Sequence, residues 1–514
     1  MKTLSQLLIQ AFKSNANNVA TTEYPSIESD VVVERTYKDI QQRVARLQSE
    51  LLHKLELIES KESVTVGIVA RNSSDWIVAD LTCLFTGVTS LPLPQAFSLS
   101  QAQHLAKKCD VFICDGAGEA TLRSKWKIGL DKKIYLRFED VLSASNDQNV
   151  LLDLASQLPT GRCKIIHTSG TTSQPKGVEL STQAIVETYK SLSVSIPQTS
   201  QKAYLSLVPL SLLLEQVTGI YLPLINGGNV NFLPPDMPII GENKCDIKVI
   251  INWIKRVQPT AITAPPILIE GLLKEIQHGD EQLLHYLQNT PHITCGGARV
   301  ATHTLKQLRE LGVDAYQGYG LSENASVVSV NTTQHNRLGS VGRPLPHVEV
   351  RIAKSGCIEI KSPSLFSGYS GQDPSSCLVD KDGWLDTGDI GYLDEENYLY
   401  VSGRKKNILC LPNGINVYPE EIESELQKQT GILAAVMFLD DLLGTVILLK
   451  VNSDIFDKAA IEKWMDKEFS EVERPNYLWV MDKSDVTLDN LFTVTDRPKR
   501  EAIKDKFKQL NNIH

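Results

Sequence analysis

Apolar residues in the first part of the chain follow two spacings, one typical of buried strands and one typical of helices. Residues 31–37 (VVVERTY) and 63–70 (SVTVGIVA) are short apolar runs that predict strands, and residues 40–57 between them repeat apolar positions at helical spacing. The alternation continues with predicted strands at 89–94 and 110–115 and predicted helices at 74–84 and 98–107. Strands that alternate with helices predict a largely parallel sheet with helices on its faces.

A second series of strands and helices runs from residue 181 to residue 317. Its expected elements are helices at 181–192, 247–256, 267–276, 280–288 and 301–311 and strands at 204–208, 230–233, 260–263, 292–294 and 314–317. Beyond residue 340 the apolar runs shorten and are separated by Gly and Asp, which is typical of strands joined by turns. The last part has its own apolar runs, AAVMFL and TVILLKV, and predicts a small separate unit.

These patterns predict an α/β fold in two domains. We expect a large N-terminal domain over residues 1–403, built from mixed, largely parallel sheets with flanking helices and a β-rich subdomain. Residues 404–514 would form a small, mobile α+β lid domain.

The composition is that of an ordinary globular protein, with 514 residues, 42% of them hydrophobic and 22% charged. A net charge of −9 argues against a general nucleic-acid surface. The nine cysteines are scattered without a C-x-x-C pair and predict reduced thiols in the cytosol. The first 14 residues read as an amphipathic helix and not as a secretion signal, and no apolar run reaches the ~18 residues of a spanning helix. We therefore expect a cytoplasmic protein without a transmembrane segment, for which peripheral membrane contact stays open.

A loop rich in Gly, Ser and Thr reads HTSGTTSQPKGV over residues 167–178. Its glycines let the backbone approach an oxyanion, its hydroxyls can donate, and Lys176 adds a compact positive charge. Gly170 and Lys176 have the spacing of a Walker loop, but Pro175 and Gly177 replace the glycine and the hydroxyl residue that such a loop needs. The pattern predicts a phosphate-handling loop outside the Walker class, with an ordinary surface turn as the alternative.

Four further motifs carry candidate chemistry. The paired glycines of CGGA (295–298) would let a flat ligand approach the backbone, and YQGYGLSE (316–323) offers an aromatic face for a base and a carboxylate suited to Mg²⁺. DTGD (386–389) places an acidic side chain at a turn, where it could chelate two ribose hydroxyls, and GRKKN (403–407) is basic and lies at the expected domain boundary. Taken singly, CGGA could be a turn between a strand and a helix, DTGD an ordinary Asp/Gly turn and GRKKN a solvated charge run, whereas YQGYGLSE is more specific.

The ordered occurrence of these five motifs over about 240 residues resembles the adenylate-forming superfamily, which includes acyl-CoA synthetases, peptide-synthetase adenylation domains and beetle luciferase. The resemblance covers nearly the whole chain and implies a two-step reaction. A carboxylate attacks the α-phosphate of Mg-ATP to give acyl-AMP and pyrophosphate, and a thiol then attacks the mixed anhydride. Because nucleophile and electrophile are both anionic, the site needs Mg²⁺ and cationic or N–H donors directed at the phosphoryl oxygens.

The resemblance also implies roles for single residues. The β- and γ-phosphates would lie on the loop, Mg²⁺ at Thr168 and Glu323, the ribose at Asp389 and Arg404, and the hinge of the small domain at Lys406. Gly297, Ala298 and Tyr319 would sandwich adenine. The residues implied to bind ATP are Thr168, Ser169, Gly170, Thr171, Thr172, Lys176, Gly296, Gly297, Ala298, Gln317, Gly318, Tyr319, Gly320, Ser322, Asp389 and Arg404. Those implied to be catalytic are Lys176, Glu323 and Arg497.

Two departures from the family pattern bear on activity, and the first lies near the C-terminus. The family usually carries a lysine between a threonine and an arginine there, and aligning on Thr493 and Arg500 puts Arg497 in its place. An arginine keeps the charge but replaces a compact ammonium with a planar fork, and a displacement of about 1 Å can cost about 10²-fold in rate. Adenylation would then be slow, unless Lys499 supplies the ammonium; a solvated basic tail is the remaining alternative.

The second departure lies in VPLSLLLEQ (208–216), which resembles the family's acyl-pocket motif but has Leu212 where histidine or an aromatic residue is frequent. The expected pocket residues are Leu212, Leu213, Leu214 and Gly296, although the leucines could equally be core. No aspartate stands nearby for the ammonium of an amino acid. We therefore predict an ATP- and Mg²⁺-dependent ligase that joins an apolar carboxylic acid, a medium- or long-chain fatty acid, to CoA or a phosphopantetheinyl carrier protein. The alternative is a catalytically weakened homologue that binds nucleotide or acyl groups.

Overall fold

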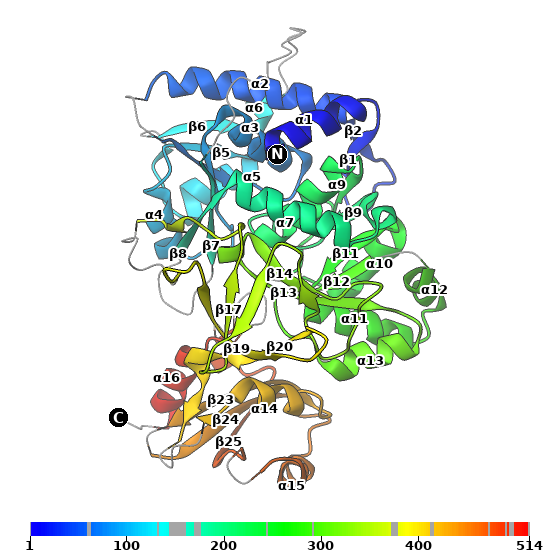
Figure 1. The fold of residues 1–514 in the computed structure, drawn as a ribbon, viewed down its shortest axis with the longest axis vertical. Coiled ribbons are helices and arrows are strands. Elements are labelled where there is room, and N and C mark those ends of the chain that lie inside the picture. Colours follow the sequence, from blue (N-terminus) through cyan, green and yellow to red (C-terminus); the bar gives the residue numbers. More distant parts are fainter. Residues whose placement is uncertain are drawn as a thin grey trace.

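The fold is that of a computed structural model of the whole chain (Figure 1). The structure describes residues 2–58, 63–130, 133–142, 161–168, 176–242, 245–289, 292–371, 379–411, 416–440, 442–470, 473–488, 491–492 and 498–511. The centre of the phosphate-handling loop, residues 169–175, and Arg497 lie outside this set.

One large sheet carries two of the five motifs, CGGA and YQGYGLSE. Its described strands run in the order β15 (Arg343–Pro344), β14 (Ser326–Val330), β13 (Ala315–Leu321), β12 (His292–Cys295), β11 (Ala261–Ala264), β9 (Ala203–Ser206), β10 (Asn229–Phe232), β1 (Val19–Glu23) and β2 (Val33–Thr36). The strands from β13 to β1 are parallel, and the edge strands pair antiparallel. Because the carboxyl ends of parallel strands share one edge, the motifs after β12 and in β13 lie side by side.

A second sheet carries the phosphate-handling loop. Its described strands run in the order β18 (Gly368–Tyr369), β8 (Lys176–Ser181), β7 (Arg162–Thr168), β4 (Thr89–Pro92), β3 (Thr65–Val69), β5 (Val111–Cys114) and β6 (Ile134–Arg137). The strands from β7 to β6 are parallel, whereas β8 pairs antiparallel with β7 and β18 antiparallel with β8. Thr168 stands opposite Lys176 in the β7–β8 pair, so the two ends of the loop meet.

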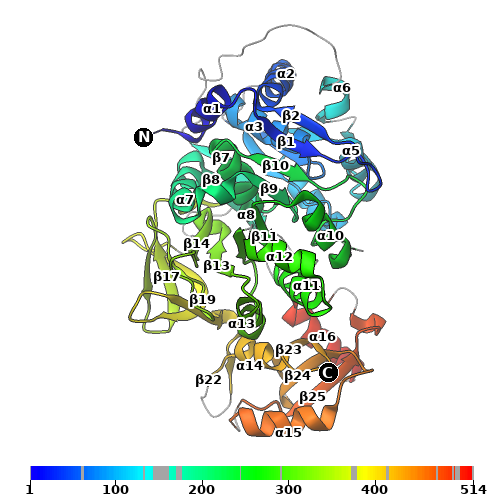
Figure 2. The same cartoon turned by 90° about the vertical axis from the view of Figure 1, so that its right-hand side faces the viewer.

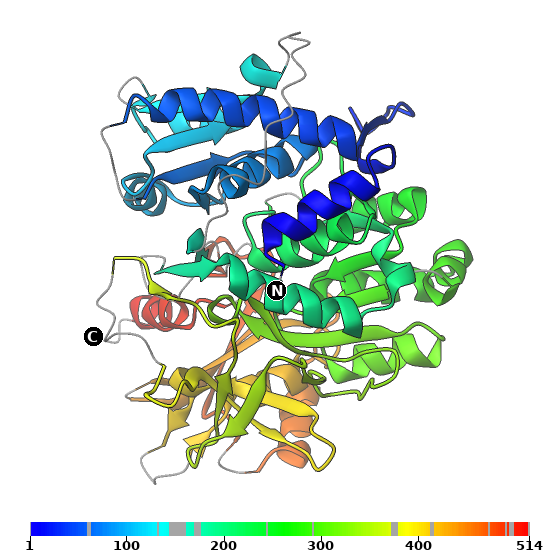
Figure 3. The ribbon, with the colours of Figure 1, turned by 45° about the horizontal axis from the view of Figure 1, so that its top comes forward.

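Helices flank these two sheets, and the figures show the long helix α2 running along the outside of the molecule (Figure 3). Their bounds are α1 (Leu4–Ser14), α2 (Tyr37–Leu55), α3 (Ser74–Thr86), α4 (Leu99–Ala106), α5 (Gly116–Ala120), α6 (Phe138–Leu142), α7 (Thr182–Ser195), α8 (Leu213–Gln216), α9 (Leu222–Ile225), α10 (Ile247–Val257), α11 (Pro266–Gln277), α12 (Glu281–Asn289) and α13 (Thr302–Glu310). Helix α2 begins at Tyr37 because Thr36 and Asp39 form a capping box. Helix α3 ends at Gly87, whose φ of 78° gives the left-handed cap that glycine adopts without strain. None of the described helices combines the length and the apolar character needed to cross a membrane.

The β-rich subdomain is an antiparallel sheet with the described order β16 (Glu349–Ile352), β17 (Cys357–Lys361), β19 (Leu385–Leu393) and β20 (Leu399–Arg404). The last part of the chain lies below it in Figures 1 and 2 and consists of β21 (Leu409–Cys410), β22 (Asn416–Val417), α14 (Pro419–Leu426), β23 (Ile432–Asp440), β24 (Gly444–Val451), α15 (Lys458–Glu468), β25 (Tyr477–Asp482) and α16 (Arg500–Leu510). Strands β23, β24 and β25 form their own sheet and carry hydrophobic clusters of their own.

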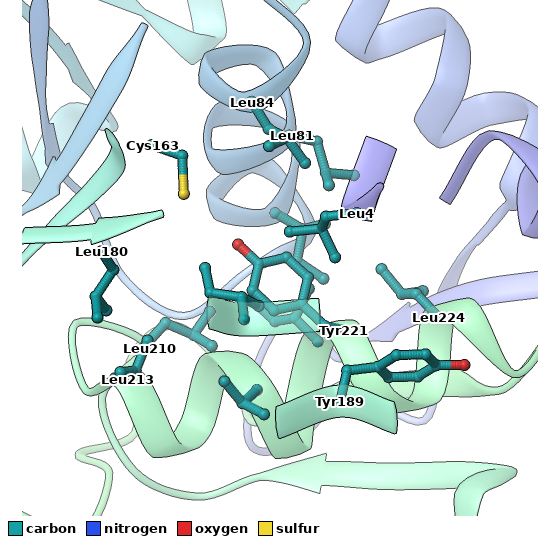
Figure 4. Close-up of a cluster of buried hydrophobic side chains, with 14 of the residues drawn as sticks. Leu4, Leu81, Leu84, Cys163, Leu180, Tyr189, Leu210, Leu213, Tyr221 and Leu224 are labelled. Atoms are coloured by element: carbon teal, nitrogen blue, oxygen red, sulfur yellow. The ribbon is translucent and has the colours of Figure 1, made fainter. Parts of the chain in front are cut away.

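A continuous hydrophobic core joins α1, α3, α7, β7, β8 and the segment around α8 (Figure 4). Leu4, Leu81, Leu180 and Tyr221 from four separate elements meet there. Leu213 is 3% exposed and belongs to this core. Of the two alternatives for the leucine run, acyl pocket or core, Leu213 therefore follows the second. Leu212 is 38% exposed, and Leu214 is partly buried against the core.

Candidate active site

Tyr319, Asp389 and Arg404 meet where the large sheet contacts the β-rich subdomain. The Tyr319 hydroxyl donates to Asp389 Oδ2 at 2.6 Å, and Arg404 Nε lies 2.7 Å from Asp389 Oδ1. The β19–β20 register sets Arg404 directly opposite Asp389, while Tyr319 arrives from β13. Tyr319 from the large sheet and Arg404 from the β-rich subdomain therefore both contact the carboxylate of Asp389, and all three residues were predicted to bind the nucleotide.

The surroundings set the electrostatics of this carboxylate. Asp389 is buried, and burial raises its pKa, although the Arg404 guanidinium and the Tyr319 hydroxyl oppose the rise. Burial and the neighbouring carboxylate raise the pKa of Tyr319, so its hydroxyl keeps the proton that it donates. A carboxylate has about four lone-pair sites, and two stay available for further donors once Tyr319 and Arg404 are counted.

The glycines of the CGGA and YQGYGLSE motifs lie side by side at the ends of β12 and β13. Cys295 and Gln317 are paired across β12 and β13, which brings Gly296 beside Gly318. A Cβ atom added to Gly296 would lie 3.4 Å from the Gly318 carbonyl oxygen, and one added to Gly320 would lie 1.8 Å from the Ser326 carbonyl oxygen. Only glycine fits at 320, because the Ser326 backbone occupies the space that a side chain would need; at Gly296 the backbone is more open, and a flat ring can approach it. Gly296, predicted to line both the ATP site and the acyl pocket, thus lies beside Gly318 of the YQGYGLSE motif.

A second cluster joins Glu323 to Lys176 through Tyr369, a residue that the motif analysis missed. The Tyr369 hydroxyl donates to Glu323 Oε1 at 2.9 Å, and Lys176 Nζ lies 5.0 Å from the centre of the Tyr369 ring. Tyr369 stands between Gly368 and Gly371, and an aromatic residue flanked by glycines is the signal that could have found it.

Two residues of the quoted motifs are buried ionisable groups whose burial the sequence does not indicate. His167 is the first residue of the 167–178 motif and lies in β7, and burial first, then the charges of Lys108 and His104, lower its pKa to about 3. Glu215 follows the leucine run and accepts from Tyr204 and Ser206 at 2.7 Å each, and burial raises its pKa to about 7. A Glu directly after an apolar run gives no sign of burial in the sequence.

Contacts on both sides of Lys406 agree with its predicted place at a hinge, which stays a prediction. Arg404 contacts Asp389 and Lys405 Nζ lies 3.0 Å from Asp386 Oδ2, so these residues are held by the β-rich subdomain. Asn407 donates to Glu420 of α14 at 2.5 Å. Burial, then the charge of Arg404, lowers the pKa of Lys406.

The remaining predicted residues are placed as follows. Thr168 ends β7, Gln317, Gly318 and Gly320 lie in β13, Ser322 follows it, and Gly297 and Ala298 follow β12; Ser169, Gly170, Thr171, Thr172 and Arg497 lie outside the described residues. Arg500, the residue used to align the C-terminal motif, is buried against Glu423 of α14. Lys499, just before α16, donates its backbone N–H to the Leu491 carbonyl at 2.8 Å.

Acidic, aromatic and glycine residues at the carboxyl ends of adjacent parallel strands, with a basic loop end nearby, define a nucleotide-type site. The chain belongs to the AMP-binding enzyme family, whose model matches residues 12–370. This confirms the resemblance to adenylate-forming enzymes.

The chain is also similar in sequence to individual members of this family. The chain is 29% identical to the 2-succinylbenzoate–CoA ligase of Bacillus velezensis over 53% of this chain and 54% of that protein. It is 24% identical to the long-chain-fatty-acid–CoA ligase ACSBG2 of Gallus gallus over 73% of this chain and 58% of that protein. It therefore spans somewhat more than half the length of these two relatives.

The solved structure of O-succinylbenzoate coenzyme A synthetase from Bacillus subtilis, in complex with ATP and a magnesium ion, matches with a TM-score of 0.78. The match covers 97% of this chain and 99% of that chain at 20% identity. At 20% identity the match establishes similarity of fold only, and it confirms the predicted α/β class.

Proposed function

We propose that this protein activates a carboxylic acid with ATP and transfers the acyl group to a thiol. The acid's carboxylate oxygen forms a bond to the α-phosphorus, pyrophosphate leaves, and the thiol sulfur then displaces AMP from the acyl carbon. The observation that carries the proposal is the shared carboxylate of Asp389, held by Tyr319 and Arg404 within a chain of the AMP-binding enzyme family.

The residues at this carboxylate fit a nucleotide. Asp389 has lone pairs left for two ribose hydroxyls, and the Tyr319 and Arg404 contacts fix the direction in which they point. At Gly296, where an added Cβ would meet only the Gly318 carbonyl at 3.4 Å or more, the backbone leaves room for a flat base. Asp389 and Arg404 would hold the ribose, and Tyr319 with Gly297 and Ala298 would hold the adenine.

The residues at the loop end fit a magnesium-bound polyphosphate. Glu323 is partly exposed and offers a carboxylate, which is the type of ligand that Mg²⁺ combines with substrate phosphates. Lys176 is exposed at the start of β8, opposite Thr168, where its ammonium can reach a phosphate oxygen. Thr168 and Glu323 would hold the ion, which when bound would neutralise the phosphate charge that repels an anionic nucleophile.

The acid is proposed to be apolar, a medium- or long-chain fatty acid. Leu212 is exposed directly before α8 and offers an aliphatic wall. The names of the relatives differ on this point, since one is a ligase for a fatty acid and another a ligase for 2-succinylbenzoate. Both are named as CoA ligases, which supports CoA as the thiol over a carrier protein.

The small domain is proposed to rotate about Lys406 between the two half-reactions. Arg404 and Lys405 are held on the large-domain side and Asn407 on the α14 side, so the backbone of one residue lies between the two sets of contacts. Rotation there would bring a basic group, Arg497 or Lys499, to the reacting carboxylate.

The test is carboxylate-dependent exchange of pyrophosphate into ATP, measured with palmitate, octanoate, 2-succinylbenzoate, benzoate and leucine. We expect exchange with the two fatty acids and a large loss in Glu323→Gln. Exchange with 2-succinylbenzoate alone would contradict the apolar fatty acid but not the reaction. Thiol consumption with CoA or with a phosphopantetheinyl carrier protein then identifies the acceptor.

A further inference from the structure

Tyr369 stands between two groups of the proposed ATP site that come from different parts of the chain. Its hydroxyl donates to Glu323 Oε1 at 2.9 Å, and its ring lies under the Lys176 ammonium at 5.0 Å from the ring centre. An ammonium within about 6 Å of an aromatic face is attracted to it. One side chain thus contacts both the carboxylate proposed for the metal and the cation proposed for the phosphates.

Backbone pairing fixes where Tyr369 stands. Strand β18 sets Tyr369 opposite Val178 of β8, and the next N–H, that of Ser370, donates to the Gly177 carbonyl at 2.7 Å. At the other end of the same segment, the Phe366 N–H donates to the Glu323 carbonyl at 2.8 Å. The segment is therefore hydrogen-bonded both to the strand that begins at Lys176 and to Glu323 itself.

Packing fixes the ring as well. The Phe366 and Tyr369 rings meet edge to face with centres 4.9 Å apart, and Phe366 is buried in the main core. Aromatic pairs of this geometry stabilise each other beyond their buried area. The tyrosine hydroxyl consequently has a defined position relative to the Glu323 carboxylate.

We propose that Tyr369 is a positioning residue that orients the Glu323 carboxylate for a divalent cation and holds the Lys176 ammonium beside it; this inference rests on the proposed function. Oε1 of Glu323 accepts a hydrogen bond from the hydroxyl, and among the described residues Oε2 receives no hydrogen bond, so Oε2 is the oxygen left to contact a cation. Carboxylates that bind metals are generally oriented by such hydrogen bonds, and loss of the partner weakens metal affinity or activity by about 10- to 100-fold.

The hydroxyl and the ring of Tyr369 have separable effects. Tyr369→Phe removes the hydrogen bond to Glu323 and keeps the ring under Lys176. Tyr369→Leu removes both contacts. We expect the first change to act on the metal only, and the second to act in addition on ATP affinity at saturating metal, by about 2- to 5-fold.

The experiment measures binding of ATP to the full-length protein by equilibrium dialysis while Mg²⁺ is titrated at fixed ATP, without any acid present. In Tyr369→Phe the Mg²⁺ concentration for half-maximal binding should rise about 10- to 100-fold, with ATP affinity at saturating Mg²⁺ nearly unchanged. Tyr392→Phe is the matched control, because Tyr392 is exposed and stacks on Tyr400 in the β-rich subdomain. It should titrate like the wild type.

A double-mutant cycle with Glu323→Gln separates positioning from folding. If Tyr369 acts through Glu323, adding Tyr369→Phe to Glu323→Gln should change the Mg²⁺ requirement by less than about 2-fold. An unchanged Mg²⁺ requirement in Tyr369→Phe, or an effect of equal size in the Glu323→Gln background, would overturn the inference and leave the proposed function standing. Failure of the wild type to bind ATP with or without Mg²⁺ would overturn both.

Discussion

Replacing Asp389 with asparagine tests the proposed ribose contact with little change of shape. The amide oxygen can still accept from the Tyr319 hydroxyl, whereas the amide NH2 then faces Arg404 and the ion pair and hydrogen bond to Arg404 are lost. Arg404 is 51% exposed, so water can solvate its guanidinium once the charge of the buried Asp389 is removed, and a solvated partner limits the cost to about 0–1 kcal/mol. The free energy of unfolding should therefore change by less than about 1 kcal/mol.

The expected effect on nucleotide binding is larger. Hydrogen bonds to charged groups contribute about 1.5–3 kcal/mol each, and the asparagine retains one accepting oxygen. Losing one charged hydrogen bond to a ribose hydroxyl, about 2 kcal/mol, corresponds to about 30-fold weaker ATP binding.

The assay compares the Kd of ATP with that of 2′,3′-dideoxy-ATP in wild type and Asp389→Asn. The wild type should prefer ATP by about 10³-fold, because the analogue lacks both hydroxyls that Asp389 is proposed to bind, and the variant should prefer it by only about 30-fold. Asp386→Asn is the control from the same turn, since Asp386 contacts Lys405 and Cys357 instead, and it should keep the preference. An Asp389→Asn protein that discriminates like the wild type would refute the ribose contact.

The remaining predictions concern stability. Leu213→Ala should lower the free energy of unfolding in urea by about 2–5 kcal/mol, because the side chain is buried in the core, and Leu212→Ala by about 0.5 kcal/mol or less; equal losses would contradict the assigned burial. Arg500→Leu should cost about 3–5 kcal/mol because it leaves Glu423 charged and buried, and adding Glu423→Leu should restore most of that loss; additive losses would speak against a coupled pair. Burial lowers the pKa of His292 to about 4, so the folded state keeps it neutral while the unfolded state gains a proton as pH falls from about 6.5 to about 4. Stability should fall through that window by about 3 kcal/mol, a loss that His292→Phe removes; identical pH slopes for the two proteins would contradict this.

The strongly periodic parts of the fold could be predicted from the sequence, while elements that depend on distant partners could not. Helix α2 was expected at 40–57 and spans Tyr37–Leu55, and the strand expected at 31–37 is β2, Val33–Thr36. Strand β1 was missed because it is rich in threonine, and Thr21 is buried only through its neighbours in the sheet. Strand β8 was missed because its pairing with β7 across the loop is not visible in a six-residue run that begins with Lys and Gly.

The same distinction applies to the candidate site. Asp389 and Tyr319 stand in local motifs whose residue types already suggest nucleotide chemistry, and the structure brings them into contact. Tyr369 could not be connected to Glu323 and Lys176 from the sequence, because that contact depends on the pairing of β18 with a strand far away along the chain. The proposed role of Arg497 rests on the sequence alone, since Arg497 lies outside the described residues.

The most direct test of the central claim follows the oxygen atoms of the acid. The acid that supports pyrophosphate exchange is labelled with ¹⁸O in its carboxylate and incubated with the enzyme, ATP, Mg²⁺ and CoA, and the AMP produced is examined by mass spectrometry. Attack of the carboxylate on the α-phosphorus predicts one ¹⁸O atom in each AMP released. AMP without ¹⁸O, or label in inorganic phosphate with ADP as the product, would contradict activation through an acyl-adenylate.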